Sequence, residues 1–170
     1  MPLGVEASRV KLVLEVEDGK VRVVRCLEQR VCRALEERGY LRDDVLSPLE
    51  AAFMLARCTA ELEGEGCGWV TALEVASLYG SAEAFFVYYD LRRRGRLVFP
   101  GIRRGTLLVN YGRSRRVEVK ILVEGGLVSI GELLEWSRTA AGDDKEPVIA
   151  VVSGHGDVTY YSARAVRGFT

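Results

Sequence analysis

Three residues that could take part in RNA chemistry, Tyr111, Arg138 and Lys145, each fall near the end of a predicted helix or strand. A tyrosine and a lysine can assist RNA cleavage without metal, because one activates the ribose 2′-OH while the other stabilises charge on the phosphate. Arginine can stack on an unpaired base and bind its phosphate. In an α/β layer these three ends could converge on one edge of a sheet. The set lacks a general acid for the 5′-oxygen leaving group.

A second candidate site is the Glu118-Val119-Lys120 sequence on a predicted strand. A carboxylate followed two residues later by a lysine is half of the pattern used by metal-dependent nucleases, which also need a second carboxylate from a neighbouring strand. No Asp or Glu occurs from Leu91 to Val117. The residues are therefore interpreted as part of an ordinary alternating strand, and no metal site is predicted.

A third candidate is the pair His155 and Asp157, which could serve as acid and base. Both residues alternate with glycine in a predicted hairpin tip, where nothing would hold the two side chains in place. Turn formation alone explains the glycines and the aspartate, so a catalytic role is not favoured.

The charge of the chain is unevenly distributed although the formal net charge of the 170 residues is zero. Residues 1–80 hold ten Lys and Arg against fourteen Asp and Glu, whereas residues 81–170 hold fourteen against ten. The segment from Arg92 to Arg116 contains nine arginines and no acidic residue. Such a field suits a polyanion such as RNA, and the alternative is a solvated, arginine-rich surface.

The chain shows no apolar run of the ~20 residues that a membrane span needs and no signal-peptide pattern. A cytoplasmic protein without a membrane partner is therefore expected. The four cysteines form no CxxC pair, and the single histidine is far from them in sequence, which argues against a zinc site. Buried free thiols are the favoured interpretation, with a disulfide between Cys58 and Cys67 as the alternative.

The pattern of apolar residues predicts an α+β or α/β fold in two domains, 1–80 and 81–170. In the first domain we expect a hairpin of strands 10–16 and 21–26, then helices at 27–38, 48–62 and from Thr71 to about Gly80. In the second we expect a helix at 82–94, strands at 96–99, 106–111 and 117–123, a helix from Ser129 to about Ala141, and strands at 148–153 and 158–163. Capping boxes are predicted at Ser47, Thr71 and Ser129.

Three segments in the expected order resemble archaeal tRNA-splicing (tRNA-intron) endonuclease subunits. Residues 38–40 (RGY) and 46–55 (LSPLEAAFML) are similar to the family's LS-x-x-EA helix, and 86–95 (FVYYDLRRRG) to its Y-x-VY-x-DLR-x-RG helix. Residues 145–161 are similar to the ending K-E-x-V-x-A-V-V…G-D-V-T-Y-Y. The resemblance covers most of the chain.

The resemblance implies a small N-terminal α+β domain and a C-terminal nuclease-like domain with a mixed β-sheet packed by helices. It implies cleavage of bulge-helix-bulge intron junctions in precursor tRNA, with 2′,3′-cyclic phosphate and 5′-hydroxyl products and no metal or other cofactor. The family's catalytic set is a tyrosine, a histidine and a lysine. Lys145 matches the lysine, Arg138 the base-clamping arginine, and Tyr111 the tyrosine when counted from Gly105, although Gly105-Thr106-Leu107-Leu108 departs from the family's G-A-D-F.

The family's histidine has no counterpart, since its expected region holds Arg113, Arg115 and Arg116 instead. A chain with the lysine but not the histidine resembles the structural subunit of the heterotetrameric enzyme, in which two catalytic paralogues join two structural subunits. The three arginines are then expected to contact RNA. The resemblance also places the final strand and its hairpin at subunit interfaces, for which the predicted residues are His155, Asp157, Val158 and Tyr160.

Two alternatives remain open from the sequence. One is a self-sufficient nuclease that uses Arg115 or Arg116 in place of the histidine, or a metal ion at Glu118. Arginine is a poor general acid, because its pKa exceeds about 12. The other is an RNA-binding assembly module that has no connection with splicing.

Overall fold

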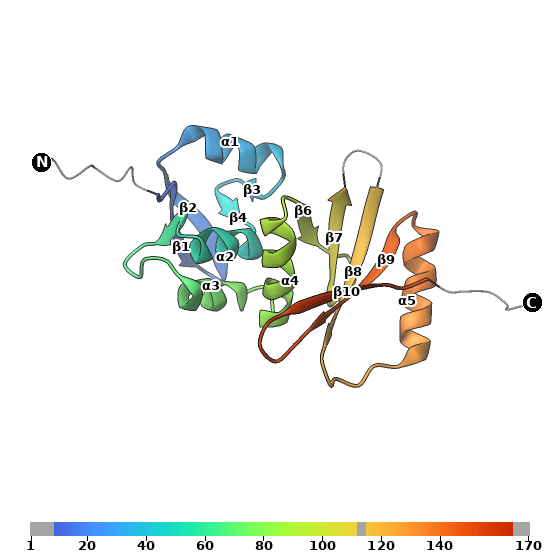
Figure 1. The fold of residues 1–170 in the computed structure, drawn as a ribbon. Helices are drawn as coiled ribbons and strands as arrows, with labels where there is room; N and C mark the ends of the chain where they lie inside the picture. Colours follow the sequence, from blue (N-terminus) through green and yellow to red (C-terminus); the bar gives the residue numbers. More distant parts are fainter. Residues whose placement is uncertain (1–8, 112–114, 165–170) are drawn as a thin grey trace, which may run out of the picture. The chain divides into compact units, whose positions relative to one another are not determined.

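The computed structural model of the chain describes residues 9–111 and 115–164. By its internal contacts the chain divides into two compact units, Met1–Phe85 and Phe86–Thr170. Each unit contains a five-stranded sheet together with helices (Figure 1). The predicted combination of an α+β N-terminal part and a C-terminal mixed sheet packed by helices is confirmed.

The sheet of the N-terminal unit begins with the predicted hairpin, formed by β1 (Leu12–Glu17) and β2 (Lys20–Cys26). The turn between them uses Asp18 and Gly19, both at positive φ, which matches the twist of the two antiparallel strands. Two short strands, β3 (Leu41–Arg42) and β4 (Val45–Leu46), and the strand β5 (Ala60–Leu62) complete the sheet. The strand order is β3-β4-β2-β1-β5, and β5 runs parallel to β1.

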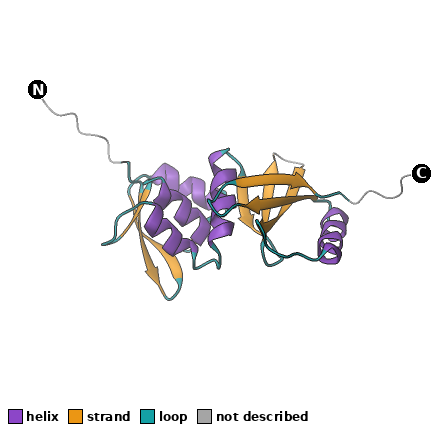
Figure 2. Ribbon diagram, turned by 60° about the horizontal axis from the view of Figure 1, so that its bottom comes forward, coloured by secondary structure: helices purple, strands orange, loops and turns teal. Residues whose placement is uncertain are grey.

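Three helices accompany this sheet: α1 (Gln29–Glu37), α2 (Pro48–Ala56) and α3 (Trp69–Ala76). Seven consecutive residues of α2, from Leu49 to Leu55, are buried, so this helix forms the centre of the unit. Helices make up much of the N-terminal unit, whereas the C-terminal unit consists mostly of strands (Figure 2).

The prediction that the helix beginning at Pro48 continues to residue 62 is wrong, because α2 ends at Ala56. Cys58 adopts a left-handed backbone conformation (φ 51°) and the hydroxyl of Thr59 donates a hydrogen bond to the Met54 carbonyl, so the chain turns into β5. The capping boxes at Ser47 and Thr71 do not form: Ser47 makes no side-chain cap, and α3 begins two residues before Thr71. The sequence analysis also missed the short strands β3 (Leu41–Arg42) and β4 (Val45–Leu46).

The expectation of free thiols is also wrong, because the four cysteines form two disulfides, Cys26–Cys32 and Cys58–Cys67. The first joins the end of β2 to α1, and the second closes the loop after α2. The turn at Cys58 redirects the chain so that Cys67 comes back beside it. The alternative pairing of Cys58 with Cys67 was therefore the better interpretation.

The C-terminal unit contains one sheet of order β10-β9-β8-β7-β6, in which only β8 and β9 run parallel to each other. Its elements agree with the predicted ones to within about two residues at each end. They are α4 (Ala82–Arg93), β6 (Leu97–Pro100), β7 (Thr106–Tyr111), β8 (Arg115–Val123), α5 (Ile130–Gly142), β9 (Glu146–Val152) and β10 (Val158–Ser162). The Ser129 cap forms as predicted, since its hydroxyl accepts a hydrogen bond from the Glu132 N–H.

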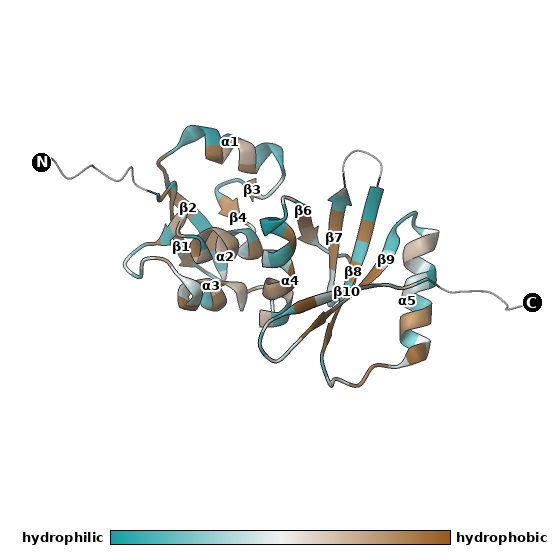
Figure 3. Cartoon of the chain, in the orientation of Figure 1, coloured by the Kyte–Doolittle hydropathy of each residue, from teal (hydrophilic) through white to brown (hydrophobic). Residues whose placement is uncertain are grey.

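The two faces of this sheet carry different residues because side chains alternate along each strand. Val117 and Val119 of β8 lie on the face toward α4, and Tyr160 on this face donates a hydrogen bond to Asp90 of α4. Glu118 lies on the opposite face, where it contacts Trp136 of α5. Central strands β7 and β8 are hydrophobic over much of their length, and the start of β8 is hydrophilic (Figure 3). We refer to these surfaces as the α4 face and the α5 face.

Gly101 is required where β6 leaves the sheet. Its N–H donates to the Thr106 carbonyl, and a Cβ atom built at Gly101 would lie 2.7 Å from that carbonyl oxygen. Because the obstructing atom belongs to the backbone, a Gly101→Ala variant should lower the free energy of unfolding by about 1–3 kcal/mol, as measured by urea denaturation.

Gly142→Ala is the matched control, since a Cβ atom at this helix-terminal position meets nothing within 4 Å. That variant should retain or slightly raise the stability, because alanine loses less backbone entropy than glycine on folding. Equal stability of the two variants would contradict the close approach at Gly101.

Candidate functional site

The strongest concentration of charge in the described C-terminal unit surrounds Lys145. The residue sits in the turn that joins α5 to β9, and its backbone N–H donates to the Ala140 carbonyl at the helix end. Asp144 adopts a left-handed conformation (φ 57°) in the same turn. The helix ending therefore directs Lys145 toward the α5 face, where its side chain is only 10% exposed.

Glu118 is the buried partner of Lys145. Its side chain is 3% exposed, and its carboxylate accepts hydrogen bonds from the Lys145 ammonium at 3.3 Å and the Trp136 indole N–H at 2.9 Å. The Arg103 guanidinium adds donations at 2.7 and 2.8 Å to the two carboxylate oxygens. Three donors thus compensate for the removal of this charge from water.

A second carboxylate, that of Asp143, completes the arrangement. It accepts hydrogen bonds from Arg103 at 3.1 Å and from Lys145 at 3.4 Å, and it is about half exposed. Two cations and two anions alternate, so their formal charges cancel. We call Arg103, Glu118, Asp143 and Lys145 the charge cluster; it joins the loop after β6, strand β8 and the α5–β9 turn.

The pKa values of the two carboxylates are lowered. Burial by itself raises the pKa of Glu118, but its hydrogen bonds to Arg103, Trp136 and Lys145 outweigh that effect. Hydrogen bonds from Arg103 and then Lys145 lower the pKa of Asp143. The hydrogen bonds to the two carboxylates also raise the pKa of Arg103. All these shifts favour the charged forms.

A cavity of about 440 Å³ lies beside the charge cluster. Glu118, Asp143 and Lys145 form its charged side together with Arg116, and Leu108 lines it from β7; Gly101 and Ile102 complete the lining. A polar group in this cavity would lie beside two cations, Lys145 of the charge cluster and Arg116, which is outside the cluster.

Glu118 and Lys120, which the sequence pattern suggested as half of a metal-dependent nuclease site, each have other partners in the described structure. The Glu118 carboxylate is already occupied by three donors, and the Lys120 ammonium lies 5.9 Å from the centre of the Trp136 ring. Within the described residues, no group of three or more His, Cys, Asp and Glu side chains could hold a metal ion. The Glu118 carboxylate thus has three donors from the protein itself.

The backbone places Tyr111 at the same end of the sheet as Lys145. Tyr111 pairs with Arg115 in the β7–β8 ladder, and Val117, two residues further along β8, pairs with Glu146 directly after Lys145. The end of β7 and the start of β9 therefore lie at the same end of the sheet, which agrees with the expectation for Tyr111 and Lys145, whereas Arg138 lies exposed on α5.

The predicted RNA-binding arginines are distributed over different surfaces. Arg115 lies on the α4 face and donates to Glu146 at 2.9 Å, whereas Arg116 lines the cavity on the α5 face. Arg138 is exposed on α5, between the buried Ser137 and the exposed Thr139. Arg113 lies outside the described residues.

The hairpin between β9 and β10 holds His155 and Asp157 apart from the charge cluster. The Ser153 hydroxyl accepts hydrogen bonds from both backbone N–H groups, at 3.3 and 3.1 Å, and Gly156 adopts positive φ. Both side chains are exposed, and within the described residues no hydrogen bond or ion pair joins them. The turn interpretation of these residues agrees with this geometry.

Strand β10 is the outer strand of its sheet, so one of its edges has no strand partner within the described residues. Val158 begins this strand, and Tyr160 points to the α4 face, where its hydroxyl donates to Asp90 at 3.0 Å. Tyr161 alternates to the other face and is 55% exposed.

Arg103, Trp136 and Asp143 were not predicted from the sequence as residues around Lys145 and Glu118. A glutamate inside an otherwise apolar strand was a signal that a counter-charge must exist. Nothing in the sequence indicated which of the nine arginines between Arg92 and Arg116 would bond to Glu118. The partner, Arg103, is determined by the position of the loop after β6 in the folded chain.

A Glu118→Gln variant should be destabilised by about 2–3 kcal/mol, because glutamine keeps the shape but leaves the Arg103 and Lys145 charges without their buried partner. Equilibrium unfolding of the full chain in urea measures the change. The control is Asp143→Asn, which alters an exposed carboxylate of the same cluster and should have a much smaller effect. Similar losses in both variants would contradict the central role of Glu118.

Stability should also fall in acid. The folded-state pKa values of Glu118 and Asp143 lie below their ordinary values of 4.5 and 3.8, so unfolding takes up protons when the pH falls through this range. The stabilisation is present above about pH 4.5 and is lost as the pH falls through the lower folded-state values. In thermal unfolding between pH 3 and pH 6, Glu118→Gln should therefore show a weaker decline than the unmodified chain, and parallel curves would contradict this.

None of the helices in the described residues is long and apolar enough to cross a membrane.

Two family models match the chain in succession. One, described as tRNA-intron endonuclease SEN2-like, N-terminal domain, matches residues 8–78. The other, described as tRNA intron endonuclease, catalytic C-terminal domain, matches residues 82–160.

Similar proteins come from several archaea. A tRNA-splicing endonuclease of Thermococcus gammatolerans is 32% identical over 131 residues, covering 72% of this chain and 77% of the relative. That of Thermococcus kodakarensis is 30% identical with the same coverage. An EndA-like protein of Methanopyrus kandleri is 37% identical over 79 residues, covering 45% of this chain and 48% of the relative. With both family models matched in order, and with relatives of at least 30% identity covered over three quarters of their length, the chain belongs to the tRNA-splicing endonuclease family.

Proposed function

We propose that this chain is the structural subunit of a heterotetrameric tRNA-splicing endonuclease. It supports cleavage of bulge-helix-bulge intron junctions in precursor tRNA by a catalytic, histidine-bearing paralogue. The products carry 2′,3′-cyclic phosphate and 5′-hydroxyl ends, and two copies of each subunit make up the enzyme.

The position of the only histidine supports this assignment best. His155 lies in the turn after β9, whereas Lys145 directly precedes β9. The strand has seven residues, and a rise of about 3.3 Å per residue separates the two side chains by roughly 20 Å or more. A histidine that donates or accepts a proton must reach the reacting group within hydrogen-bonding distance, directly or through one water. One substrate phosphate cannot contact Lys145 and His155 together.

The surroundings of Lys145 support a structural role for this lysine. Its ammonium lies between Glu118 and Asp143, and its side chain is 90% buried. A catalytic ammonium has to move its charge to the transition-state phosphate, which here would break contacts to two carboxylates. Lys145 is therefore inherited from a catalytic ancestor and now stabilises the charge cluster.

The other predicted site residues are assigned to two kinds of contact, one with substrate RNA and one with other subunits. Arg138 on α5, together with Arg115 and Arg116 at the start of β8, contacts substrate RNA, since their charge suits a phosphate backbone. The outer edge of β10, which starts at Val158, pairs with the same strand of another subunit, because a free edge is otherwise open to association. The exposed Asp157 carboxylate beside His155 enters a basic pocket on a partner.

The test is reconstitution with a purified histidine-bearing paralogue and a bulge-helix-bulge RNA. The chain alone should give no cleavage above background, and the mixture should cleave at both junctions. In mixtures whose assembly is verified by size-exclusion chromatography, His155→Ala should leave the cleavage rate unchanged, because His155 is assigned to a subunit interface and not to catalysis. Robust cleavage by the chain alone would overturn the proposal in favour of a self-sufficient nuclease.

Lys145→Ala in the same mixture separates chemistry from structure. We expect an unchanged cleavage rate at a temperature where the variant is folded, together with a lower unfolding temperature. Lys145→Met is the matched comparison, since it keeps most of the side-chain volume without the charge. A loss of rate of a hundredfold or more in both variants, with normal assembly by size-exclusion chromatography, would show that Lys145 still acts in catalysis.

A further inference from the structure

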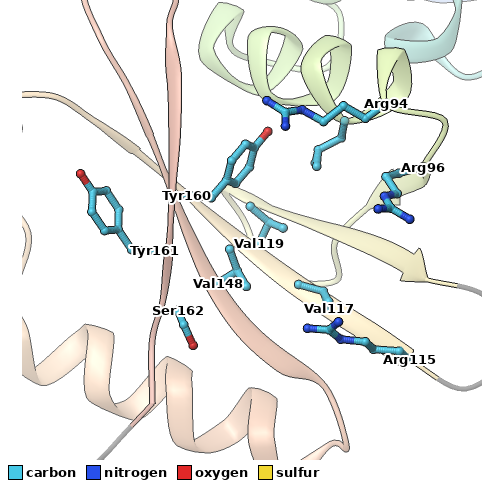
Figure 4. A pocket seen from close by; sticks show the side chains of 10 residues that line it. Arg94, Arg96, Arg115, Val117, Val119, Val148, Tyr160, Tyr161 and Ser162 are labelled. Atoms are coloured by element: carbon cyan, nitrogen blue, oxygen red, sulfur yellow. The ribbon is translucent and has the colours of Figure 1, made fainter.

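A second cavity, of about 360 Å³, lies on the α4 face of the same sheet, away from the charge cluster. Its floor is aliphatic and comes from Val117 and Val119 of β8 and Val148 of β9 (Figure 4). Leu91 at the end of α4 adds to this apolar surface. Part of the sheet is therefore left open to a ligand on this face.

Three arginines surround this floor: Arg94, Arg96 and Arg115 (Figure 4). The carboxylates that the structure pairs with them are Asp90, which accepts from Arg94 at 2.9 Å, and Glu146, which accepts from Arg115 at 2.9 Å. The side chains that line the cavity include these three arginines and no Asp or Glu, so its rim is positively charged. An occupant with an apolar, flat part and a negative charge would complement both the floor and the rim.

Tyr160, an aromatic residue that lines the cavity, is held in place by a hydrogen bond. The Tyr160 hydroxyl donates to Asp90 at 3.0 Å, and the same carboxylate oxygen accepts from the Arg94 Nε. Asp90 thus fixes the tyrosine relative to the end of α4. A fixed ring and fixed guanidinium groups reduce the entropy lost when a ligand binds.

We propose that this cavity, which we call the α4-face pocket, binds one unpaired nucleotide of a single-stranded RNA segment. The base lies on the valine floor beside Tyr160, and its phosphate contacts Arg96 and Arg115. Single-stranded RNA is typically bound by a basic groove together with side chains that cover the base faces. The volume lies within the range of roughly 300–1,000 Å³ of small-ligand sites.

The proposal rests on the proposed function only in taking RNA as the ligand, and it adds a site on the face of the sheet opposite Lys145. Side-chain alternation on β8 gives this separation, because Glu118 and Val119 must point to opposite faces. One RNA segment can therefore contact this chain without approaching the charge cluster.

The experiment uses the full chain and a fluorescein-labelled oligouridylate pentamer in fluorescence anisotropy. Arg96→Gln should weaken binding about five- to tenfold and reduce the salt dependence by about one phosphate contact. Its control is Arg104→Gln, an exposed arginine of the same acid-free segment outside the pocket, which should change the affinity less than twofold. Equal losses in the two variants would overturn the proposal, since a diffuse basic surface would explain them.

A second pair of variants tests the floor without altering charge. Val148→Phe fills the cavity and should weaken binding about tenfold while leaving the salt dependence unchanged. Ile149→Phe is the matched control, because it makes a similar change one residue further along β9 and on the other face. Circular dichroism melting confirms that each variant is folded. Unchanged affinity of folded Val148→Phe would overturn the proposal.

Three further outcomes separate the possible explanations. A tetra-aspartate peptide that displaces the RNA and loses affinity in the same variants would identify the pocket as a protein docking site and overturn the nucleotide assignment. If reconstituted cleavage fails but the pentamer follows the expected pattern, the α4-face pocket stands and the splicing role falls. If cleavage is restored but neither Arg96→Gln nor Val148→Phe affects RNA binding, the pocket proposal falls alone.

Discussion

The buried carboxylate of Glu118 constrains the C-terminal unit more than any other single group. A charge that is 97% removed from solvent is tolerated only when donors surround it, and here they come from three separate segments. Arg103 comes from the loop after β6, Trp136 from α5 and Lys145 from the turn before β9. The carboxylate thus determines where a helix, a loop and a strand start must meet.

The hydrogen bonds of Lys145 to Glu118 and Asp143 must be weighed against the catalytic role that its sequence motif suggests. In the family the motif marks a catalytic lysine, and in this chain the ammonium bonds to two carboxylates. A lysine in such surroundings is more useful as a counter-ion than as a catalyst, because its charge is already engaged. These contacts are the observation behind the structural role proposed for Lys145.

Alternation along β8 separates the surface of the sheet into two regions with different properties. The α5 face carries a charge cluster that is neutral by formal count, and the α4 face carries an aliphatic floor with an arginine rim. Arg115 and Arg116 are neighbours in sequence but belong to different regions. An arginine-rich segment therefore does not describe one RNA-binding surface, and several of its members already pair with Asp90, Glu118 or Glu146.

The sequence by itself determined the order and type of nearly all elements in the C-terminal unit. Period-two and helical apolar patterns are local properties, and the caps at Ser129 and Gly95 mark helix ends directly. The sequence also indicated that Tyr111, at the end of one strand, and Lys145, at the start of another, lie near each other. The pairing of β7, β8 and β9 agrees with this expectation for the backbone.

Only the tertiary structure decided which residues surround Lys145, how the cysteines pair and where α2 ends. Each depends on residues that are not adjacent in sequence: Arg103 bonds to Glu118, fifteen residues later, Cys67 returns to Cys58, and β5 pairs with β1 in the N-terminal sheet. Local patterns contain no information on such contacts, since the free energy of a buried ion pair or a parallel strand pair arises only when the chain brings the partners together.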